Sequence, residues 1–184
     1  MLSRIKPWTT ELAKPFANIL GRMGIQPNHL TILGLFFGLL SAYYIISGKI
    51  LIAALFVLLS SICDFLDGAL ARTANLTTNF GGFLDSVVDR YVDVILFLSL
   101  GIYGVDWVIV GLAMSGSLLV SYTRARAENV IERCDVGIAE RGERLLILLL
   151  GLITGYVYEV VLIIAVLSHI TVLQRIWHTY SRTR

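Results

Sequence analysis

Four aspartates at helical spacing are the residues in this sequence best suited to carry chemistry. They lie inside or beside apolar runs, at positions Asp64, Asp67, Asp85 and Asp89. An ionised carboxylate near hydrocarbon is costly, so four of them need compensation by cations, by water or by both. Carboxylate oxygens suit Mg²⁺, Mn²⁺ or Ca²⁺ far better than zinc, and four carboxylates can hold two ions. The sequence therefore predicts a divalent-metal site.

Helical geometry predicts how these carboxylates are presented. At about 100° of rotation per residue, positions three, four and seven apart share a face. One such face carries Asp64, Asp67, Gly68 and Ala71, and a second carries Gly81, Asp85 and Asp89. Two antiparallel helices joined by the polar residues 73–79 would turn these faces toward each other and bring the acids together.

The composition predicts an all-α integral membrane protein. Of the 184 residues, 57% are hydrophobic and only 15% are charged, which leaves too few polar side chains for an ordinary soluble surface. The net charge of +2 is too small to indicate nucleic-acid binding. Apolar stretches that can approach the roughly 20 residues of a membrane span predict six transmembrane helices, at 30–47, 50–72, 82–103, 107–126, 145–156 with its flanks, and 157–180.

We expect one membrane domain over residues 1–184, with a juxtamembrane segment at 1–28 and a six-helix core at 29–184. Apolar residues within 3–21 recur at helical spacing, which favours an amphipathic juxtamembrane helix on the membrane surface. A short helix packed on the protein itself is an equal alternative. Recurrent glycines are expected to be close-packing positions between helices, namely Gly34, Gly38, Gly111 and Gly116.

The basic residues predict the orientation. With six spans and a cytoplasmic amino terminus, Lys49 alone among the 15 lysines and arginines faces outward. We therefore expect a multi-pass protein of the cell membrane. The aspartate cluster should lie toward the cytoplasmic face, where a lipid substrate and a soluble substrate could meet.

At the aspartates, the sequence resembles the CDP-alcohol phosphotransferase family. The family signature reads D-x2-D-G-x2-A-R-x8-G-x3-D-x3-D, and this chain fills all of its specified positions, with Asp64, Asp67, Gly68, Ala71, Arg72, Gly81, Asp85 and Asp89. The alternative is a set of helix-end carboxylates paired with arginines. Only Arg72 and Arg90 lie near enough in the sequence to neutralise the four acids, which disfavours it.

The resemblance implies a reaction and a set of roles. An alcohol oxygen attacks the lipid-proximal phosphorus of a CDP-lipid and expels CMP. Asp64, Asp67 and Asp85 would bind Mg²⁺ or Mn²⁺, with two ions expected, and Asp89 would be a ligand, a general base or both. The residues expected to bind the CDP-lipid are Gly68, Ala71, Arg72 and Gly81, together with Asn28 and Thr31 of a P-N-x-x-T stretch. The family also implies a homodimer.

The acceptor alcohol is predicted from a second group of residues, which brackets the polar connection at 127–143. Arginine forks recognise phosphate well, so this group could hold an anionic acceptor. It consists of Ser121, Arg124, Arg141 and Arg144. The surrounding segments resemble the inositol-phosphate branch of the family, although Arg124 stands where that branch often has lysine. Alternatively, these arginines obey the positive-inside rule and pair with Glu128, Glu140 and Glu143.

We therefore predict a membrane enzyme that transfers the phosphatidyl or archaetidyl group of a CDP-lipid to inositol 1-phosphate. A relative that uses glycerol phosphate is the closest alternative enzyme. A divalent-cation transporter would also place acids within helices, but it should show acids near the midplane, broken helices and often repeated halves. The acids here gather toward one face, and the sequence shows no repeat.

Overall fold

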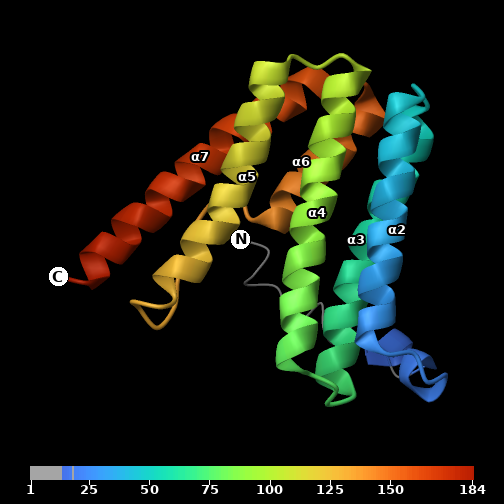
Figure 1. Ribbon diagram of the computed structural model, residues 1–184, viewed down its shortest axis with the longest axis vertical. Helices are drawn as coiled ribbons and strands as arrows, with labels where there is room; N and C mark the ends of the chain where they lie inside the picture. Colours follow the sequence, from blue (N-terminus) through green and yellow to red (C-terminus); the bar gives the residue numbers. More distant parts are fainter. Residues whose placement is uncertain (1–13, 18) are drawn as a thin grey trace. The chain divides into compact units, whose positions relative to one another are not determined.

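The computed structural model is all-α and describes residues 14–17 and 19–184. The chain divides into two compact units at a point within the helix Asn79–Tyr103, the first ending at Ser99 and the second spanning Leu100–Arg184. The helices of 14 or more residues among the described residues are α2 (Pro27–Ile46), α3 (Ile50–Thr73), α4 (Asn79–Tyr103), α5 (Trp107–Ala127), α6 (Arg141–Thr154) and α7 (Val157–Arg182) (Figure 1). Their bounds follow the six predicted apolar stretches to within about three residues, with α2 and α4 beginning three residues early, and α6 includes four residues of the flank before 145–156.

In the first unit, α2 and α3 form an antiparallel hairpin joined by a short turn (Figure 1). The Ser41 hydroxyl donates to the Ala53 carbonyl at 3.0 Å, and the Ser60 hydroxyl donates to the Gly34 carbonyl at 2.9 Å. Each hydrogen bond satisfies a buried polar group and fixes the position of one helix along the axis of the other. This fixed register determines which residues of α2 face the aspartates of α3.

The segment before α2 lies partly outside the described residues. Residues 1–13 and 18 of the predicted amphipathic helix are not described, whereas 14–17 and 19–22 are helical. In the described part, Ala17 is buried with Leu30 and Leu70, while the Phe16 and Ile19 side chains are exposed. Part of this segment therefore packs on the helical hairpin.

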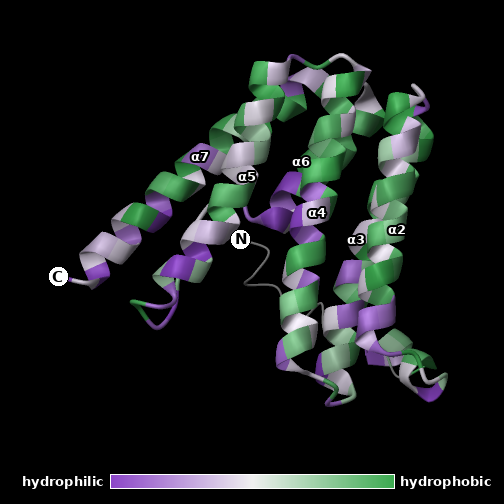
Figure 2. Cartoon of the chain, in the orientation of Figure 1, coloured by the Kyte–Doolittle hydropathy of each residue, from purple (hydrophilic) through white to green (hydrophobic). Residues whose placement is uncertain are grey.

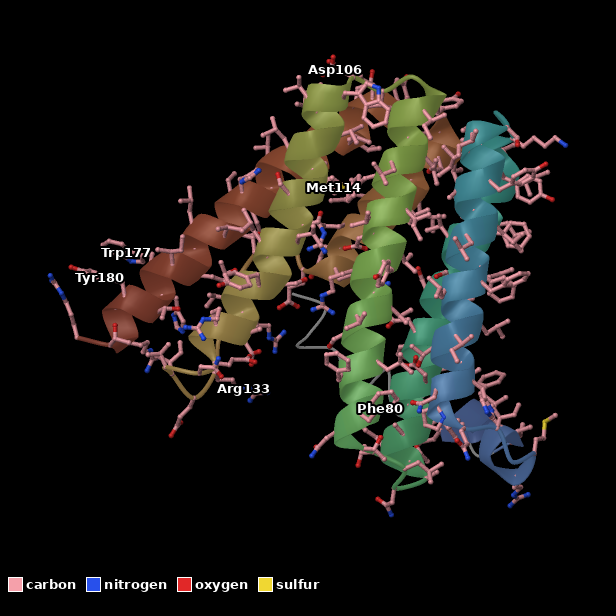
Figure 3. The ribbon with its side chains drawn as sticks, viewed as in Figure 1. Phe80, Asp106, Met114, Arg133, Trp177 and Tyr180 are labelled. Carbon is pink, nitrogen blue, oxygen red and sulfur yellow. The ribbon has the colours of Figure 1, made fainter. Side chains whose placement is uncertain are left out.

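In the second unit, α5 packs along α7, and α6 packs along the start of α7. Asp106 caps α5 by accepting hydrogen bonds from the backbone of Val108 and Ile109 (Figure 3). The turn between α6 and α7 is made by Gly155, whose φ of 83° lies in the left-handed region that favours glycine.

Three of the four predicted packing glycines are confirmed. A Cβ on Gly34 would meet Cys63, one on Gly38 would meet Val92, and one on Gly116 would meet Ser168, each within 3.4 Å. The prediction for Gly111 was wrong, because a Cβ there would meet no heavy atom within 4 Å. The spacing of glycines along the sequence cannot distinguish a glycine at a helix crossing from one on an open helix face.

Four of the described helices, α2, α3, α5 and α7, are long and apolar enough to cross a membrane. Figure 2 shows that α2 is hydrophobic along most of its length, and many large apolar side chains on these helices are exposed. Helix α4 has 25 residues but carries the charged positions Asp85, Asp89, Arg90 and Asp93. Helix α6 has only 14 residues, about 21 Å at 1.5 Å per residue. It is therefore shorter than the roughly 30 Å hydrocarbon core.

Candidate active site

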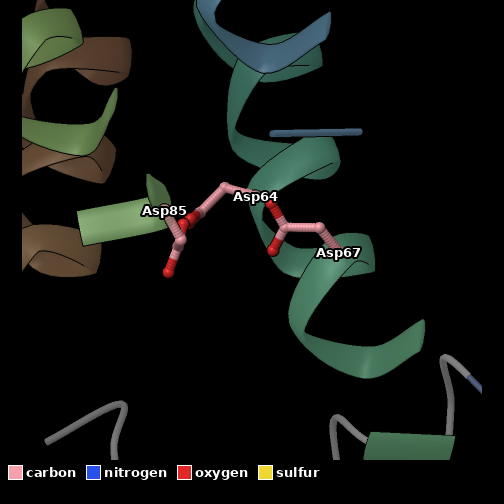
Figure 4. A group of neighbouring side chains, drawn as sticks. All are labelled: Asp64, Asp67 and Asp85. Atoms are coloured by element: carbon pink, nitrogen blue, oxygen red, sulfur yellow. The ribbon is translucent and has the colours of Figure 1, made fainter. Parts of the chain in front are cut away.

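Three of the four predicted metal ligands converge. Asp64 and Asp67 project from adjoining turns of α3, and Asp85 faces them from α4 (Figure 4). Each offers a carboxylate oxygen, and these oxygens all lie within 4.8 Å of one another. Asp67 is only 4% exposed. Carboxylates brought this close together repel one another unless a cation lies between them, so this donor set fits Mg²⁺ or Mn²⁺.

Asp89 lies one helical turn beyond Asp85 and is not part of this group of three. Its carboxylate is 3.8 Å from Nη1 of Arg90, and the Arg90 guanidinium also donates to the Ser86 carbonyl. The half-buried Asp89 therefore stands beside the cluster on the same helix face. Such a position suits a residue that acts next to bound cations.

Thr31 joins α2 to the acidic cluster. Its hydroxyl donates to Oδ2 of Asp67 at 2.7 Å, and both side chains are buried. The hydroxyl also lies 3.2 Å from the Pro27 carbonyl, but it has a single proton and its shorter contact is with the carboxylate. Sequence reasoning placed Thr31 with the CDP-lipid. The structure shows that it orients a predicted metal ligand.

The remaining residues expected to bind the nucleotide lie close to one another in pairs. The Arg72 guanidinium lies against Gly68, with Nη1 3.1 Å from where a Cβ would stand, and Oδ1 of Asn28 lies 3.2 Å from the corresponding point on Gly81. The Gly81 backbone N–H donates to the Thr78 hydroxyl at 2.9 Å. A Cβ at Gly81 would lie 2.9 Å from the Thr78 hydroxyl oxygen and force a shift there, whereas a Cβ at Gly68 would only press the Arg72 guanidinium slightly aside. Ala71 is half-buried on the face that it shares with Gly68.

In the second unit, Arg124 contacts three carboxylates. Nε is 2.9 Å from Oε1 of Glu128, Nη2 is 2.9 Å from Oδ1 of Asp135, and Nη1 is 3.8 Å from Oε1 of Glu140. Pairing with Glu128 and Glu140 was the alternative to phosphate binding that the sequence left open. The structure shows this pairing and adds Asp135.

The other predicted acceptor residues are divided between buried and accessible positions. Arg144 is 3% exposed, and its Nη1 donates to the Ala139 carbonyl at 3.1 Å. Arg141, at the first position of α6, is half-buried, and so is Ser121 on α5. Arg144 therefore supports the end of the connection between α5 and α6, whereas Arg141 and Ser121 are partly accessible.

Comparison with known proteins assigns the family. The model of the CDP-alcohol phosphatidyltransferase family matches residues 25–176, which include both the aspartate signature and the Arg124 group. The chain belongs to this family. It is therefore a CDP-alcohol phosphatidyltransferase and not a cation transporter.

Relatives of this phosphatidyltransferase match over nearly their whole length. An archaetidylinositol phosphate synthase of Pyrococcus horikoshii is 37% identical, over 99% of this chain and 98% of its own. The phosphatidylinositol phosphate synthase of Mycobacterium tuberculosis with CDP-DAG bound is 30% identical, with a TM-score of 0.81 over 92% of this chain and 94% of its own. A structure of the same enzyme with manganese and citrate gives 31% identity and a TM-score of 0.82, over 91% and 88%.

Sequence reasoning gave no site role to Arg175, which is 2% exposed within α7 of this phosphatidyltransferase. Its Nε donates to the Val136 carbonyl at 2.9 Å, Nη1 donates to the Val120 carbonyl, and Nη2 lies 3.5 Å from Oε1 of Glu140. Arg175 and Arg124 thus share the Glu140 carboxylate. The signal was present in the sequence, because an arginine two turns inside an apolar span indicates function or a buried partner.

Proposed function

We propose that this phosphatidyltransferase transfers the phosphatidyl or archaetidyl group of a CDP-lipid to inositol 1-phosphate and releases CMP. The observation that carries the proposal is the convergence of Asp64, Asp67 and Asp85 within the family signature. The inositol phosphate synthases that match this chain along most of their length support the choice of acceptor.

The carboxylates of α3 and α4 would hold Mg²⁺ or Mn²⁺, with two ions proposed. Metal ions held by these carboxylates would supply positive charge against the pyrophosphate and against the charge that develops on the leaving CMP. The Thr31 hydroxyl holds Asp67 in one orientation. Asp89 would accept the proton of the attacking alcohol, or add a ligand, or do both. A carboxylate is a weak base toward an alcohol, so proton transfer must accompany attack at a closely positioned oxygen.

We propose that the CDP-lipid nucleotide binds along the signature, at Gly68, Ala71, Arg72 and Gly81, with Asn28 beside it. The absence of side chains at the two glycines lets phosphates and ribose approach the backbone. The Arg72 guanidinium, which lies against Gly68, supplies positive charge to this pocket.

The acceptor phosphate would bind to the second group, at the partly accessible Ser121, Arg124 and Arg141, with the buried Arg144 holding the end of the connection beneath them. The Arg124 side chain is 35% exposed, so a soluble anion can reach its guanidinium. The inositol-phosphate branch often has lysine at this position. Arginine keeps the positive charge and adds an edge of two N–H donors that can bind two phosphate oxygens at once. We also propose that the protein spans the membrane six times, that its active site faces the cytoplasm, and that it forms a homodimer.

An acceptor competition assay with the purified protein tests this function. Radiolabelled CDP-diacylglycerol or CDP-archaeol is supplied with inositol 1-phosphate, free inositol, glycerol 3-phosphate or serine, and labelled lipid product and CMP are measured. We expect turnover with inositol 1-phosphate. Preferential turnover with glycerol 3-phosphate or with free inositol would contradict the assigned acceptor while leaving the family unchanged.

Replacing Arg124 tests the acceptor site separately. We expect Arg124→Gln to raise the KM for inositol 1-phosphate about tenfold, because it removes a charge-assisted hydrogen bond. The KM for CDP-lipid should change little. The exposed Arg126, on the same helix, provides a matched control, since Arg126→Gln makes the same charge change. Equal effects from both variants would point to general charge and not to a phosphate site.

A further inference from the structure

The guanidinium that should receive the acceptor phosphate already contacts acidic side chains. Each of the three nitrogens of Arg124 faces a different carboxylate, from Glu128, Asp135 or Glu140. A phosphate binds an arginine most strongly through two parallel N–H donors on one edge of the guanidinium. An edge made by the two terminal nitrogens includes Nη2, which Asp135 holds at 2.9 Å. An incoming phosphate must therefore compete with Asp135.

Of the three acids, Asp135 is the one best placed to leave. Its Oδ1 binds Arg124, while its Oδ2 lies 2.6 Å from Nε of Arg133. The Arg133 side chain is 82% exposed and projects from the connection between α5 and α6 (Figure 3). Asp135 can thus release Arg124 and keep a cationic partner.

The other two acids are held differently. Glu128 binds Nε of Arg124 from one turn further along the chain, which leaves both terminal nitrogens to other partners. Glu140 is 15% exposed on its side chain and also contacts the buried Arg175. Glu140 lies 3.8 Å from Nη1 of Arg124, longer than a hydrogen bond, and so leaves the N–H groups of that nitrogen to a phosphate. The carboxylates of Glu128 and Glu140 can therefore stay in place and orient Arg124 when Asp135 moves.

The backbone around Asp135 is anchored on both sides. Cys134 is fully buried, and the Val136 carbonyl accepts a hydrogen bond from Arg175. Further along, the Ala139 N–H donates to the Thr171 hydroxyl at 3.0 Å. Release of Arg124 therefore requires rotation of one side chain and no opening of the connection.

We propose that Asp135 is an internal competitor for the acceptor phosphate, holding Arg124 in the free enzyme and moving onto Arg133 alone when the phosphate binds. The proposal rests on the proposed function through the role of Arg124. It has a consequence for specificity, because a phosphate monoester carries the charge needed to displace a carboxylate, whereas an uncharged polyol does not. Asp135 thus raises the KM for the acceptor and favours phosphorylated over free alcohols.

The test compares Asp135→Asn with Glu132→Gln, which removes the same charge from an exposed position on the same connection. CMP release is measured at saturating CDP-lipid while inositol 1-phosphate is varied. We expect Asp135→Asn to lower the acceptor KM about two- to fivefold, the range of a partly exposed ion pair. Glu132→Gln should leave it unchanged. An unchanged CDP-lipid KM in both variants shows that each is folded.

Three further measurements test whether the effect of Asp135 acts through Arg124. In an Arg124→Gln background, Asp135→Asn should have no effect on the acceptor KM, because the two residues act as a pair. Inorganic phosphate, used as a competitive inhibitor, should bind Asp135→Asn more tightly by the same factor. Arg133→Gln removes the second partner of Asp135 and should raise the acceptor KM, which provides a test independent of the Asp135 variant.

The outcomes separate this proposal from the one on which it rests. If Arg124→Gln raises the acceptor KM but Asp135→Asn leaves it unchanged or raises it, the competitor role is overturned and the acceptor site survives. Equal effects from Asp135→Asn and Glu132→Gln would also overturn it, as an effect of general charge. If Arg124→Gln leaves the acceptor KM unchanged, both proposals fail.

Discussion

Substituting Thr31 tests the link between α2 and the acidic cluster. Thr31→Val keeps the branched shape and approximate volume of the side chain but removes the hydroxyl that donates to Asp67 at 2.7 Å. The Asp67 carboxylate would then lose the donor that fixes its orientation. We expect weaker binding of Mg²⁺ or Mn²⁺ and, through it, slower release of CMP.

The magnitude follows from the environment of the bond. Both side chains are buried, with Asp67 4% and Thr31 5% exposed, so water cannot replace the lost donor. A hydrogen bond to a charged group is worth about 1.5–3 kcal/mol, or about a ten- to hundredfold change in an equilibrium constant. Partners that orient metal ligands have effects of about the same size on metal affinity. We therefore expect the half-activating Mn²⁺ concentration to rise at least about tenfold.

Two readouts measure this change. Mn²⁺ is titrated into the CMP-release assay at saturating substrates, and the metal-dependent rise in Tm is recorded without substrate, since a ligand that binds the folded state stabilises it. Thr31→Ser is the matched control because it retains the hydroxyl and loses only a methyl group. It should keep most of the metal affinity.

The result that would refute this reasoning is a Thr31→Val variant with unchanged Mn²⁺ dependence in both readouts. A raised CDP-lipid KM at unchanged metal affinity would return Thr31 to the nucleotide pocket, where the sequence resemblance placed it. Equal loss in Thr31→Val and Thr31→Ser would assign the effect to packing of the methyl group.

Four other substitutions have definite expected outcomes. Asp85→Asn should abolish CMP release while leaving a folded membrane protein, and full activity at limiting Mg²⁺ or Mn²⁺ would contradict its role as a ligand. Asp89→Asn should bind metal and CDP-lipid but turn over slowly if Asp89 is the base, whereas lost metal binding in a calorimetric titration would make it a ligand. Arg144→Gln should lower the acceptor kcat/KM about tenfold or more with little change in CDP-lipid binding, because it removes the buried hydrogen bond to the Ala139 carbonyl that supports the acceptor group, and unchanged acceptor kinetics would show that this support does not affect the acceptor site. Gly151→Ala should lower the Tm, because the new Cβ would lie 2.1 Å from Cγ2 of Val160 and overpacking costs about 1–3 kcal/mol; an unchanged Tm would show that α6 and α7 can separate at little cost.

The sequence by itself predicted the features that depend on local geometry. The spacing of Asp64 and Asp67 places both on one face of any helix, and the apolar stretches set helix bounds that the structure follows closely. That Asp85 would face them followed from the short connection between the two helices. The signature then allowed the family to be predicted, because its specified positions lie within two consecutive helices joined by a short turn of fixed length.

Tertiary structure decided which distant side chains meet. Thr31 and Asp67 are 36 residues apart, and Arg175 of α7 reaches Val136 and Glu140 in the connection between α5 and α6. Periodicity shows which face of a helix a residue occupies, but it does not show how far one helix is shifted along the axis of its neighbour. A shift of one turn, about 5.4 Å, would separate the Thr31 hydroxyl from its carboxylate. The hydrogen bonds and close glycine contacts between α2 and α3 fix this axial position, and with it the orientation of the buried Asp67 carboxylate.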